Sequence, residues 1–459
     1  MSVSIANRFF FIGVGGIGMS GLARYFRRHG AQVAGYDRTP SELTAHLMGE
    51  GIPIQFNEDP GLIPHELRDA PSDEVLVVRT PAVPATSPLL VWWEQRGARI
   101  LKRSEVLGLI TRDRPTVAVA GTHGKTTVST MLAHLTTVGG IKCNAFLGGI
   151  AVNYDTNVML NDDAILNVVE ADEYDRSFLQ LDPAQAIVTA MDPDHLDIYG
   201  TPEAMFSAYD EFAARCKGLL LVHRTIAHHF SAHPNMVPYA LDDTSGPHAT
   251  NVRVENGRYV FDLNTEGHSL RDVQLGMPGR HNVENAVAAS TIALRLGVAP
   301  EKLVDGLATF EGVARRFRTH IAGPEVVYID DYAHHPRELE ACIGSVREMH
   351  PNRRVTGVFQ PHLFTRTRDL APGFARALAL LDELLLLDIY PAREEPIPGI
   401  TAQWLLEQVP MDVKECCTRE GLMERLATRD LDVLVTMGAG DIDRLVLPIE
   451  RLLNERYSS

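Results

Sequence analysis

Two glycine-rich turns, each between a strand-like run and a helix-like stretch, carry residues whose spacing suggests chemistry. The first is Gly13-x-Gly15-x-x-Gly18, which follows the apolar run Phe9 to Val14, and Asp37 lies 19 residues beyond Gly18. Glycines in such a turn let the backbone approach a pyrophosphate, which then sits at the positive end of a helix. By itself the pattern is typical of a dinucleotide-binding dehydrogenase or of glycines that serve close packing alone.

The second turn is Gly121-Thr122-His123-Gly124-Lys125-Thr126-Thr127, directly after the strand-like run Thr116 to Ala120. Its Gly-Lys-Thr core has the parts of a P-loop: backbone amides around the phosphates, a lysine for the β and γ oxygens, and a hydroxyl for magnesium. Val119 stands where the general pattern has its first glycine, so the loop is a shortened variant. The strand before it and the helix after it favour phosphate binding over an accidental match.

Carboxylates and an imidazole follow further strand-like runs. Glu170-Ala171-Asp172-Glu173 ends the run Ile165 to Val169, and Asp194-His195 follows another strand. A nucleoside triphosphate needs a divalent ion, which such groups could hold at the ligand edge of a parallel sheet. Individually these residues are more often solvated loop residues, but their shared placement beside a P-loop favours metal binding.

A third polar segment, Asp330-Asp331-Tyr332-Ala333-His334-His335-Pro336, ends the strand-like run Val326 to Ile329. Paired histidines after paired aspartates could suggest a metal site, but nothing nearby completes one, so contact with a nucleotide or substrate is the better interpretation. His362 and the pair Arg366 and Arg368 form another cluster. Guanidinium groups suit carboxylates and phosphates, although two arginines on the surface of a helix remain the alternative.

Strand-like and helix-like segments alternate along the chain in three blocks, which predicts an α/β protein with parallel sheets. Helices are expected at Met19 to Arg28 and at Ser104 to Ile110, the second capped by Ser104. The stretch Asn251 to Leu275 alternates apolar and polar residues around Asn256-Gly257, which predicts an antiparallel hairpin. Further strands are expected at these positions: Gln32 to Tyr36, Ala164 to Val169, Ala186 to Ala190, Val355 to Phe359, Leu384 to Ile389 and Leu434 to Thr436.

The composition is that of a globular protein with an acidic balance. Among 459 residues, 43 are Lys or Arg and 59 are Asp or Glu, a formal net charge of −16. This argues against a nucleic-acid or anionic-membrane partner, although local amides and cations can still hold small anions. The five cysteines show no CxxC spacing, no signal peptide is recognisable, and no run approaches the ~20 apolar residues of a spanning helix. We therefore expect a cytoplasmic protein with reduced thiols.

Nine strings resemble the Mur ligase family in their chain order: GVGGIGMSGLA, AVAGTHGKTT, EADEYDRSFL, DPDHLDIYG, GRHNVENA, ARRF, DDYAHHP, FQPHLFTRTRDL and LLLLDIYPAREEPIPG. The likeness runs from Phe11 to about Gly440, and it is greatest to the branch that adds L-alanine to UDP-N-acetylmuramate in peptidoglycan synthesis. The resemblance implies three domains: a Rossmann-like UDP-sugar-binding domain at 1–106, a P-loop ATPase domain at 107–313 and a Rossmann-like C-terminal domain at 314–459.

The implied reaction uses ATP and Mg²⁺. The lactyl carboxylate of UDP-N-acetylmuramate attacks the γ-phosphate, and the amine of L-alanine then captures the acyl phosphate. In this family the first glycine turn holds the UDP pyrophosphate, which leaves an NAD-dependent dehydrogenase as a minor alternative.

The resemblance also implies roles for individual residues. Catalytic roles fall on Lys125, Glu170, His195, Arg316, His334 and Arg366. ATP contacts fall on Gly121, Thr122, His123, Gly124, Lys125, Thr126, Thr127, His281, Asn282, Asn285, Arg316 and Asp331. Metal ligands are Thr126, Glu170 and His195. Substrate contacts fall on Gly15, Gly16, Gly18, Met19, Ser20, Asp37, Thr80, Pro81, Tyr332, His334 and Arg366.

Two features depart from the patterns of relatives. Leu363 replaces an arginine found after Gln-Pro-His in many alanine-adding relatives, so Arg366 or Arg368 would have to hold the alanine carboxylate. No lysine lies between His195 and Lys217, whereas several sister ligases carry a modified lysine there. Other readings are a ligase that recycles an intact tripeptide onto the same sugar nucleotide and a non-catalytic sensor of cell-wall precursors. A monomer or a weak homodimer is expected.

Overall fold

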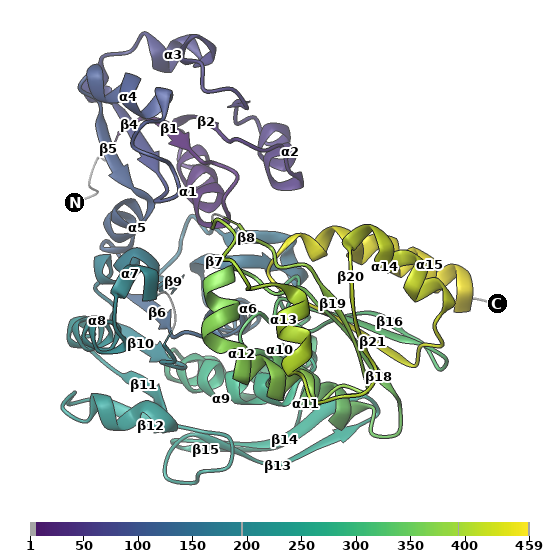
Figure 1. Cartoon of the computed structure of the whole chain (residues 1–459). Helices are drawn as coiled ribbons and strands as arrows, with labels where there is room; N and C mark the ends of the chain where they lie inside the picture. The colour runs from purple at the N-terminus through teal and green to yellow at the C-terminus, as the bar shows by residue number, and fades with distance from the viewer. Residues whose placement is uncertain (1–5, 194–195, 393, 458–459) are drawn as a thin grey trace. The chain divides into compact units, whose positions relative to one another are not determined.

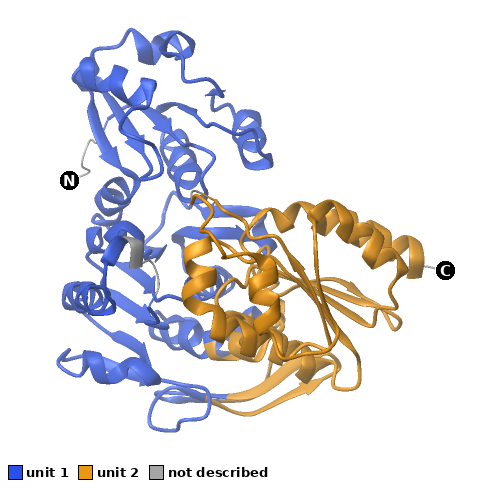
Figure 2. Cartoon of the chain, in the orientation of Figure 1, with its two compact units in different colours: residues 1–248, 263–269, 285–306 blue, residues 249–262, 270–284, 307–459 orange. Residues whose placement is uncertain are grey.

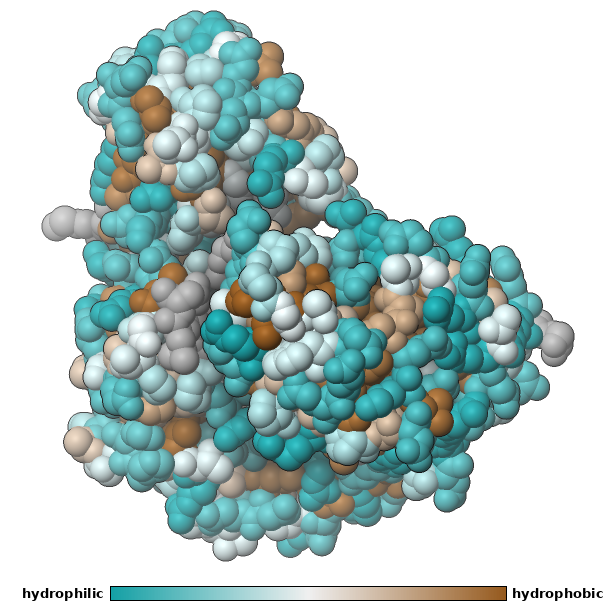
Figure 3. Space-filling model, in the orientation of Figure 1, coloured by the Kyte–Doolittle hydropathy of each residue, from teal (hydrophilic) through white to brown (hydrophobic). Residues whose placement is uncertain are grey.

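The computed structural model describes residues 6–193, 196–392 and 394–457, and the chain forms two compact units (Figures 1 and 2). Unit 1 comprises Met1–His248, Leu263–Ser269 and Asn285–Gly306. Unit 2 comprises Ala249–Asp262, Leu270–Glu284 and Leu307–Ser459. No helix in the described part of the chain combines the length and apolarity needed to cross a bilayer. Hydrophilic residues cover most of the face drawn in Figure 3.

Unit 1 begins with a five-stranded parallel sheet in the order β3-β2-β1-β4-β5. In its central strand, Phe9 and Phe11 pack into one hydrophobic core, and Phe10 and Ile12 pack into the core on the other face. An apolar run therefore forms a strand buried on both faces. The strands are β1 (Arg8–Ile12), β2 (Gln32–Tyr36), β3 (Ile54–Gln55), β4 (Val75–Arg79) and β5 (Arg99–Lys102).

The helices of this first sheet are α1 (Ile17–Arg28), α2 (Glu42–Gly49), α3 (His65–Arg68), α4 (Pro88–Gln95) and α5 (Arg103–Thr111). The expectation that Ser104 caps α5 is wrong, because Lys102 is the N-cap. The Glu105 carboxylate accepts a hydrogen bond from the Lys102 backbone N–H at 2.6 Å, so the helix begins before Ser104. The domain boundary predicted after residue 106 falls within this helix.

The second sheet of unit 1 has seven strands in the order β12-β11-β10-β6-β9-β7-β8, and only β8 runs antiparallel to its neighbour. The predicted strand Thr116 to Ala120 is confirmed as β6, which is fully buried at the middle of the sheet. The other strands are β7 (Cys143–Ala151), β8 (Thr156–Met159), β9 (Leu166–Glu170), β10 (Gln185–Val188), β11 (Leu220–His223) and β12 (Met236–Tyr239).

Five helices accompany this sheet along the chain: α6 (Lys125–Val138), α7 (Leu196–Tyr199), α8 (Pro202–Arg215), α9 (Arg280–Arg295) and α10 (Pro300–Thr309). The predicted hairpin is also confirmed. Strands β13 (His248–Glu255) and β14 (Arg258–Thr265) are joined by Asn256 and Gly257, which both have positive φ, and β15 (His268–Leu275) completes a three-stranded sheet. Positive φ at both central residues is the requirement of a two-residue hairpin turn.

Unit 2 contains a six-stranded sheet in the order β16-β17-β21-β18-β19-β20, parallel except for the edge strand β16. Its strands are β16 (Arg318–Ala322), β17 (Val327–Asp331), β18 (Val355–Phe359), β19 (Glu383–Leu387), β20 (Lys414–Cys417) and β21 (Val433–Met437). Its helices are α11 (Pro336–Met349), α12 (Phe364–Leu378), α13 (Ala402–Gln408), α14 (Arg419–Thr428) and α15 (Val446–Tyr457). All four strands predicted in this part of the chain are confirmed.

Candidate active site

The first glycine turn connects β1 to α1 and is held by the two strands beside it. Gly13 has a φ of +89°, and a Cβ there would lie 2.7 Å from Thr80 Cγ2. The backbone N–H of Gly15 donates to Asp37 Oδ2 at 2.8 Å, and Pro81 follows Thr80 in the chain. The structure therefore brings Asp37 and Thr80 to the turn, as expected for strand ends at one edge of a parallel sheet.

Met19 and Ser20 lie deeper in α1 than the turn itself. Both side chains are buried, and both backbone N–H groups donate to the Gly16 carbonyl. The Ser20 hydroxyl donates to the Ile17 carbonyl and accepts from the Asn157 amide. The contact of Met19 and Ser20 with the substrate stays a prediction, because these bonds describe the start of α1 and not a bound ligand.

The P-loop lies against the end of β10. Gly121 has a φ of +131° and Gly124 a φ of +79°, both in the region that favours glycine. The Thr122 N–H donates to the Ala190 carbonyl at 3.1 Å, and the Thr189 hydroxyl donates to the carbonyls of Ala120 and His123. These bonds fix the loop's shape, while Thr126 and Thr127 lie buried in the first turn of α6.

Lys125 forms a buried ion pair at the start of α6. Its Nζ donates to the Glu173 carboxylate at 2.8 and 3.0 Å and to the Gly121 carbonyl at 2.6 Å. Burial opposes protonation of the amine, but the charges of Glu173, Asp172 and Glu170 outweigh it and raise the pKa of Lys125. The surrounding carboxylates therefore favour the charged ammonium form of Lys125.

Glu170 ends β9 at the level of the P-loop, because it pairs in register with Val119 of β6. One of its carboxylate oxygens accepts the Gly148 N–H at 3.0 Å. The Thr126 hydroxyl and the Glu170 carboxylate are oxygen ligands of the kind that Mg²⁺ prefers. His195, the third predicted ligand, lies outside the described residues, and no group of three His, Cys, Asp or Glu side chains elsewhere in the described chain could hold a metal.

Helix α9 carries three of the predicted ATP contacts, His281, Asn282 and Asn285. The Asn282 amide is buried and donates to the Pro278 carbonyl at 2.6 Å, which shapes the start of the helix. His281 Nδ1 lies 3.4 Å from Ser345 Oγ. Asn285 lies against the P-loop, because a Cβ on Gly124 would be 2.8 Å from its Oδ1. The structure thus brings Asn285 to the P-loop within unit 1 and His281 to α11 within unit 2.

Asp331 and the residues after it form a second cluster, in unit 2. The Asp331 carboxylate accepts the Phe317 and Ala333 N–H groups at 2.7 and 2.6 Å, and burial raises its pKa to about 7. The Arg316 guanidinium stacks on the Tyr332 ring at 4.7 Å and lies 4.0 Å from Glu338. These contacts place Arg316, Asp331 and Tyr332 together at the C-terminal end of β17.

His334 is surrounded by aromatic rings and charges in the same cluster. Its ring lies 5.1 Å from the Tyr332 ring and 6.2 Å from the His362 ring. Burial lowers the pKa of His334 to about 4, and the positive charge of Arg366 acts in the same direction. Nδ1 lies 3.0 Å from the Tyr332 carbonyl, an arrangement that places the proton on Nδ1 and leaves Nε2 as an acceptor.

The predicted departure at Leu363 lies beside this cluster. Leu363 is buried with a φ of +69° as the N-cap of α12, and its N–H donates to the Tyr390 carbonyl. Arg368 is exposed and forms an ion pair with Asp369 at 2.7 Å. Of the two arginines considered as replacements, Arg366 is the one whose charge acts on His334.

The low pKa values of His281 and His334, both about 4, predict a loss of stability in acid. Both imidazoles stay neutral in the folded protein, whereas the unfolded chain takes up protons below about pH 6.5. Between pH 6.5 and 4 the unfolded state binds more protons, so we expect each histidine to remove roughly 1–2 kcal/mol of stability at pH 5. Urea unfolding at pH 7.5 and 5 measures this loss.

The variants His281→Gln and His334→Gln should each lose less stability between these pH values than the unsubstituted protein. His268→Gln changes an exposed histidine and serves as the matched control. Equal losses in all four proteins would show that the two buried imidazoles do not resist protonation.

Sequence patterns did not identify two contacts of the candidate site. Glu173 was noted in its acidic run, but its ion pair with Lys125 spans 48 positions of sequence. Arg103, at the start of α5, reaches both Gly18 and Asp172. No local spacing signals contacts of this kind, because they join segments far apart in sequence that meet only in the folded chain.

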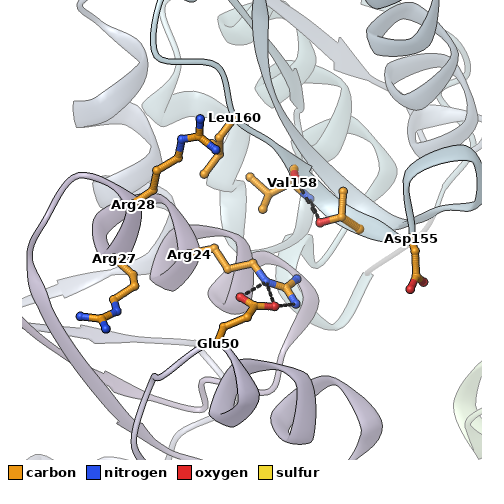
Figure 4. Close-up of a pocket in the computed structure, with 8 residues that line it drawn as sticks. Arg24, Arg27, Arg28, Glu50, Asp155, Val158 and Leu160 are labelled. Atoms are coloured by element: carbon orange, nitrogen blue, oxygen red, sulfur yellow. Dashed lines mark hydrogen bonds and ion pairs between the residues drawn. The ribbon is translucent and has the colours of Figure 1, made fainter.

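A cavity of about 420 Å³ near the C-terminal end of α1 contains none of the predicted site residues (Figure 4). Arg24, Arg27 and Arg28 line it together with Glu50 and other residues. Arg24 forms a forked ion pair with Glu50, and Arg28 pairs with Asp162 at 2.9 Å. Two of its three arginines thus pair with carboxylates, and the cavity lies apart from both glycine-rich turns.

Comparisons with known proteins agree with this geometry. Residues 8–115 match the model of the Mur ligase family catalytic domain, residues 119–293 match the Mur ligase middle domain, and residues 315–440 match the glutamate ligase domain. The curated UDP-N-acetylmuramate–L-alanine ligases of Parabacteroides distasonis and Flavobacterium johnsoniae are 46% and 44% identical over 457 residues. These alignments cover 99% of this chain and 98% and 100% of the relatives.

Among solved structures, a UDP-N-acetylmuramate-alanine ligase from Thermotoga maritima superimposes with a TM-score of 0.81 at 26% identity, covering 98% of this chain and 99% of that one. A murein peptide ligase from Psychrobacter arcticus shares the fold with a TM-score of 0.69 at 20% identity, covering 98% and 99%. The expected three-domain α/β architecture is thereby confirmed. With three consecutive domain models matched and relatives similar over nearly its whole length, the chain belongs to the Mur ligase family.

Proposed function

We propose that this protein joins L-alanine to the lactyl carboxylate of UDP-N-acetylmuramate at the expense of ATP, through an acyl phosphate, in peptidoglycan precursor synthesis. The observation that carries the proposal is its 44–46% identity with L-alanine ligases over 99% of the chain. The buried Lys125–Glu173 pair supports it, since a protein that only senses precursors would have no need of a charged P-loop lysine. The same observation argues against a dehydrogenase, in which the P-loop would have no purpose.

In this proposal the first glycine turn holds the UDP pyrophosphate. The backbone at Gly15, Gly16 and Gly18 approaches the phosphates, and the positive end of α1 attracts their charge. Asp37, Thr80 and Pro81 flank the bound sugar nucleotide. Asp37 already accepts the Gly15 N–H, so it also sets the shape of the turn.

Phosphoryl transfer takes place at the P-loop. The residues Gly121, Thr122, His123, Gly124 and Thr127 contribute backbone and hydroxyl contacts to the phosphates. Lys125 neutralises charge on the β and γ oxygens as the lactyl carboxylate attacks and ADP leaves. Asn285, which lies against Gly124, contacts the nucleotide together with His281 and Asn282.

Mg²⁺ fits the oxygen donors found here. Thr126 and Glu170 would hold one ion, and His195 would contribute a ligand to a second. Bound Mg²⁺ supplies charge neutralisation at the phosphates. Within the chain, the hydrogen bond that the Gly148 N–H donates helps to orient the Glu170 carboxylate.

The cluster in unit 2 serves ATP and the amino acid. Arg316 and Asp331 contact ATP, while Tyr332, His334 and Arg366 position L-alanine so that its amine attacks the acyl phosphate and inorganic phosphate leaves. Positioning contributes much of the rate in such a reaction. We keep the proposed domain limits at 1–106, 107–313 and 314–459, and we place the enzyme in the cytoplasm as a monomer or weak homodimer.

The amino-acid requirement distinguishes this activity from its main rival. Phosphate release from ATP, measured with Mg²⁺ and UDP-N-acetylmuramate, should depend on L-alanine and exceed the rates with glycine, L-serine or an intact tripeptide. Preference for the tripeptide would instead identify the recycling ligase. Absence of alanine-dependent phosphate release would contradict the proposal.

A further inference from the structure

Arg103 is the first residue of α5, and its side chain lies across the first glycine turn. A Cβ on Gly18 would overlap Arg103 Nη1 and would lie 2.9 Å from its Cδ and 3.2 Å from its Cζ. The guanidinium group therefore covers the glycine in the first turn of α1. Only a glycine leaves room for this approach.

The other end of the guanidinium reaches the segment that follows β9. Arg103 Nη2 donates to Asp172 Oδ2 at 3.3 Å, and the second Asp172 oxygen accepts the Tyr174 N–H at 3.1 Å. Asp172 lies between Glu170 and Glu173, the carboxylates beside the P-loop. Arg103 thus stands between the turn proposed for the sugar nucleotide and the loop proposed for ATP.

Most of the hydrogen-bonding capacity of this guanidinium is unused. Asp172 is its only hydrogen-bond partner among the described residues, whereas an arginine has five N–H donors. Its side chain is 25% exposed and that of Asp172 is 34% exposed, so a ligand can reach both. A planar guanidinium suits pyrophosphate and carboxylate oxygens.

A second ion pair already braces the same two segments. Lys102 Nζ lies 2.7 Å from Asp175 Oδ2, and the backbone of Asp175 has a positive φ. This shorter contact holds the start of α5 to the loop after β9. Lys102 therefore provides a control for a purely bracing role of the Arg103–Asp172 pair.

We propose that Arg103 binds an anionic group of the sugar nucleotide, either its pyrophosphate or its lactyl carboxylate, and that Asp172 is a positioning residue that orients the guanidinium toward it. This inference rests on the proposed function, because that reaction requires one substrate to reach from the glycine turn to the P-loop. Both anionic groups present oxygen pairs that a guanidinium can hold in the same way.

Calorimetric titration of the full-length protein with two sugar nucleotides tests the proposal. UDP-N-acetylglucosamine lacks the lactyl carboxylate that UDP-N-acetylmuramate carries. Arg103→Met should raise the Kd for UDP-N-acetylmuramate about 10- to 100-fold, the range for loss of hydrogen bonds to a charged group. If the pyrophosphate is the target, both ligands weaken equally; if the carboxylate is the target, only UDP-N-acetylmuramate weakens.

Three further variants separate binding from bracing. Lys102→Met removes the neighbouring ion pair and should leave both Kd values within about twofold of the unsubstituted protein, because the Lys102 ammonium group pairs with Asp175 and not with Asp172. Arg103→Lys keeps the charge and should restore part of the affinity. Asp172→Asn should raise the KM for UDP-N-acetylmuramate more than it lowers kcat, because it misorients the guanidinium without removing it.

The proposal is overturned if Arg103→Met and Arg103→Lys bind both sugar nucleotides as the unsubstituted protein does, or if Lys102→Met weakens binding as much as Arg103→Met. If Arg103→Met does not fold, the Kd values of Arg103→Lys for the two sugar nucleotides test the proposal. Failure of the proposed function is a different result: the unsubstituted protein would then bind no UDP-N-acetylmuramate or would release no alanine-dependent phosphate.

Discussion

Replacing Lys125 by Met should lower kcat for alanine-dependent phosphate release about 100- to 1,000-fold, the loss typical of removing a preorganised donor from a transition state. Its Nζ is fixed between Glu173 and the Gly121 carbonyl, so the ammonium group is already placed at the loop before the phosphates arrive. Steady-state kinetics measures the loss. Calorimetry should show UDP-N-acetylmuramate binding within about twofold of normal, because separate sites are independent.

Lys125→Met has a second effect that needs its own control. It leaves the Glu173 carboxylate, 1% exposed, without its cation, which costs about 3–5 kcal/mol for a buried pair. The double variant Lys125→Met/Glu173→Gln removes both charges and should regain much of that stability while staying inactive. A single variant that keeps more than a tenth of the normal kcat would contradict the role of Lys125.

The interior strands of the fold could be predicted because they are buried on both faces. Runs such as Thr116 to Ala120 and Val355 to Phe359 are continuous, and each emerges as a strand with the predicted ends. The edge strands β16 and β20 are half-exposed, so their sequences alternate or mix polar residues and carry no such signal. Short edge strands form because a neighbouring strand offers hydrogen bonds, which a local pattern does not record.

The candidate site likewise has some parts that the sequence predicted and others that it did not. Glycine and lysine spacing predicted the P-loop because every part of that loop is contiguous in sequence. Glu173 and Arg103 act across 48 and 69 positions, through contacts that exist only once the sheets have formed. The buried placement of Met19 and Ser20 was equally invisible, since a motif does not show which face of α1 packs against the core.

The chain can bind anionic substrates despite its acidic net charge, because individual cationic side chains are held in place near the proposed binding sites. Lys125 is held by Glu173 and Arg103 by Asp172, so each proposed anion-binding side chain has a carboxylate that orients it. A carboxylate partner reduces the net field felt by a ligand but fixes the geometry of the donor. Local placement therefore matters more than the net charge of −16.

Gly121→Ala should be the second most damaging change, lowering kcat/KM for ATP about 100-fold, because small displacements of a catalytic loop are costly. The added Cβ would overlap Thr189 Oγ1 and lie 2.8 Å from the Ala190 backbone nitrogen. Thr189 holds the carbonyls of Ala120 and His123, so relief of the clash must displace the loop or break those bonds. ATP titration kinetics and thermal unfolding measure the two consequences.

Gly140→Ala separates this clash from backbone strain. Gly140 also has a positive φ, +75°, but a Cβ there meets nothing within 4 Å, so only the strain of about 1 kcal/mol applies and activity should be normal. Gly121→Ala/Thr189→Ala should recover only part of the activity, since the backbone nitrogens of residues 189 and 190 still obstruct the Cβ. If Gly121→Ala alone kept kcat/KM for ATP within about threefold of normal, the loop would tolerate the displacement, and close contact with β10 would not be what shapes the phosphate site.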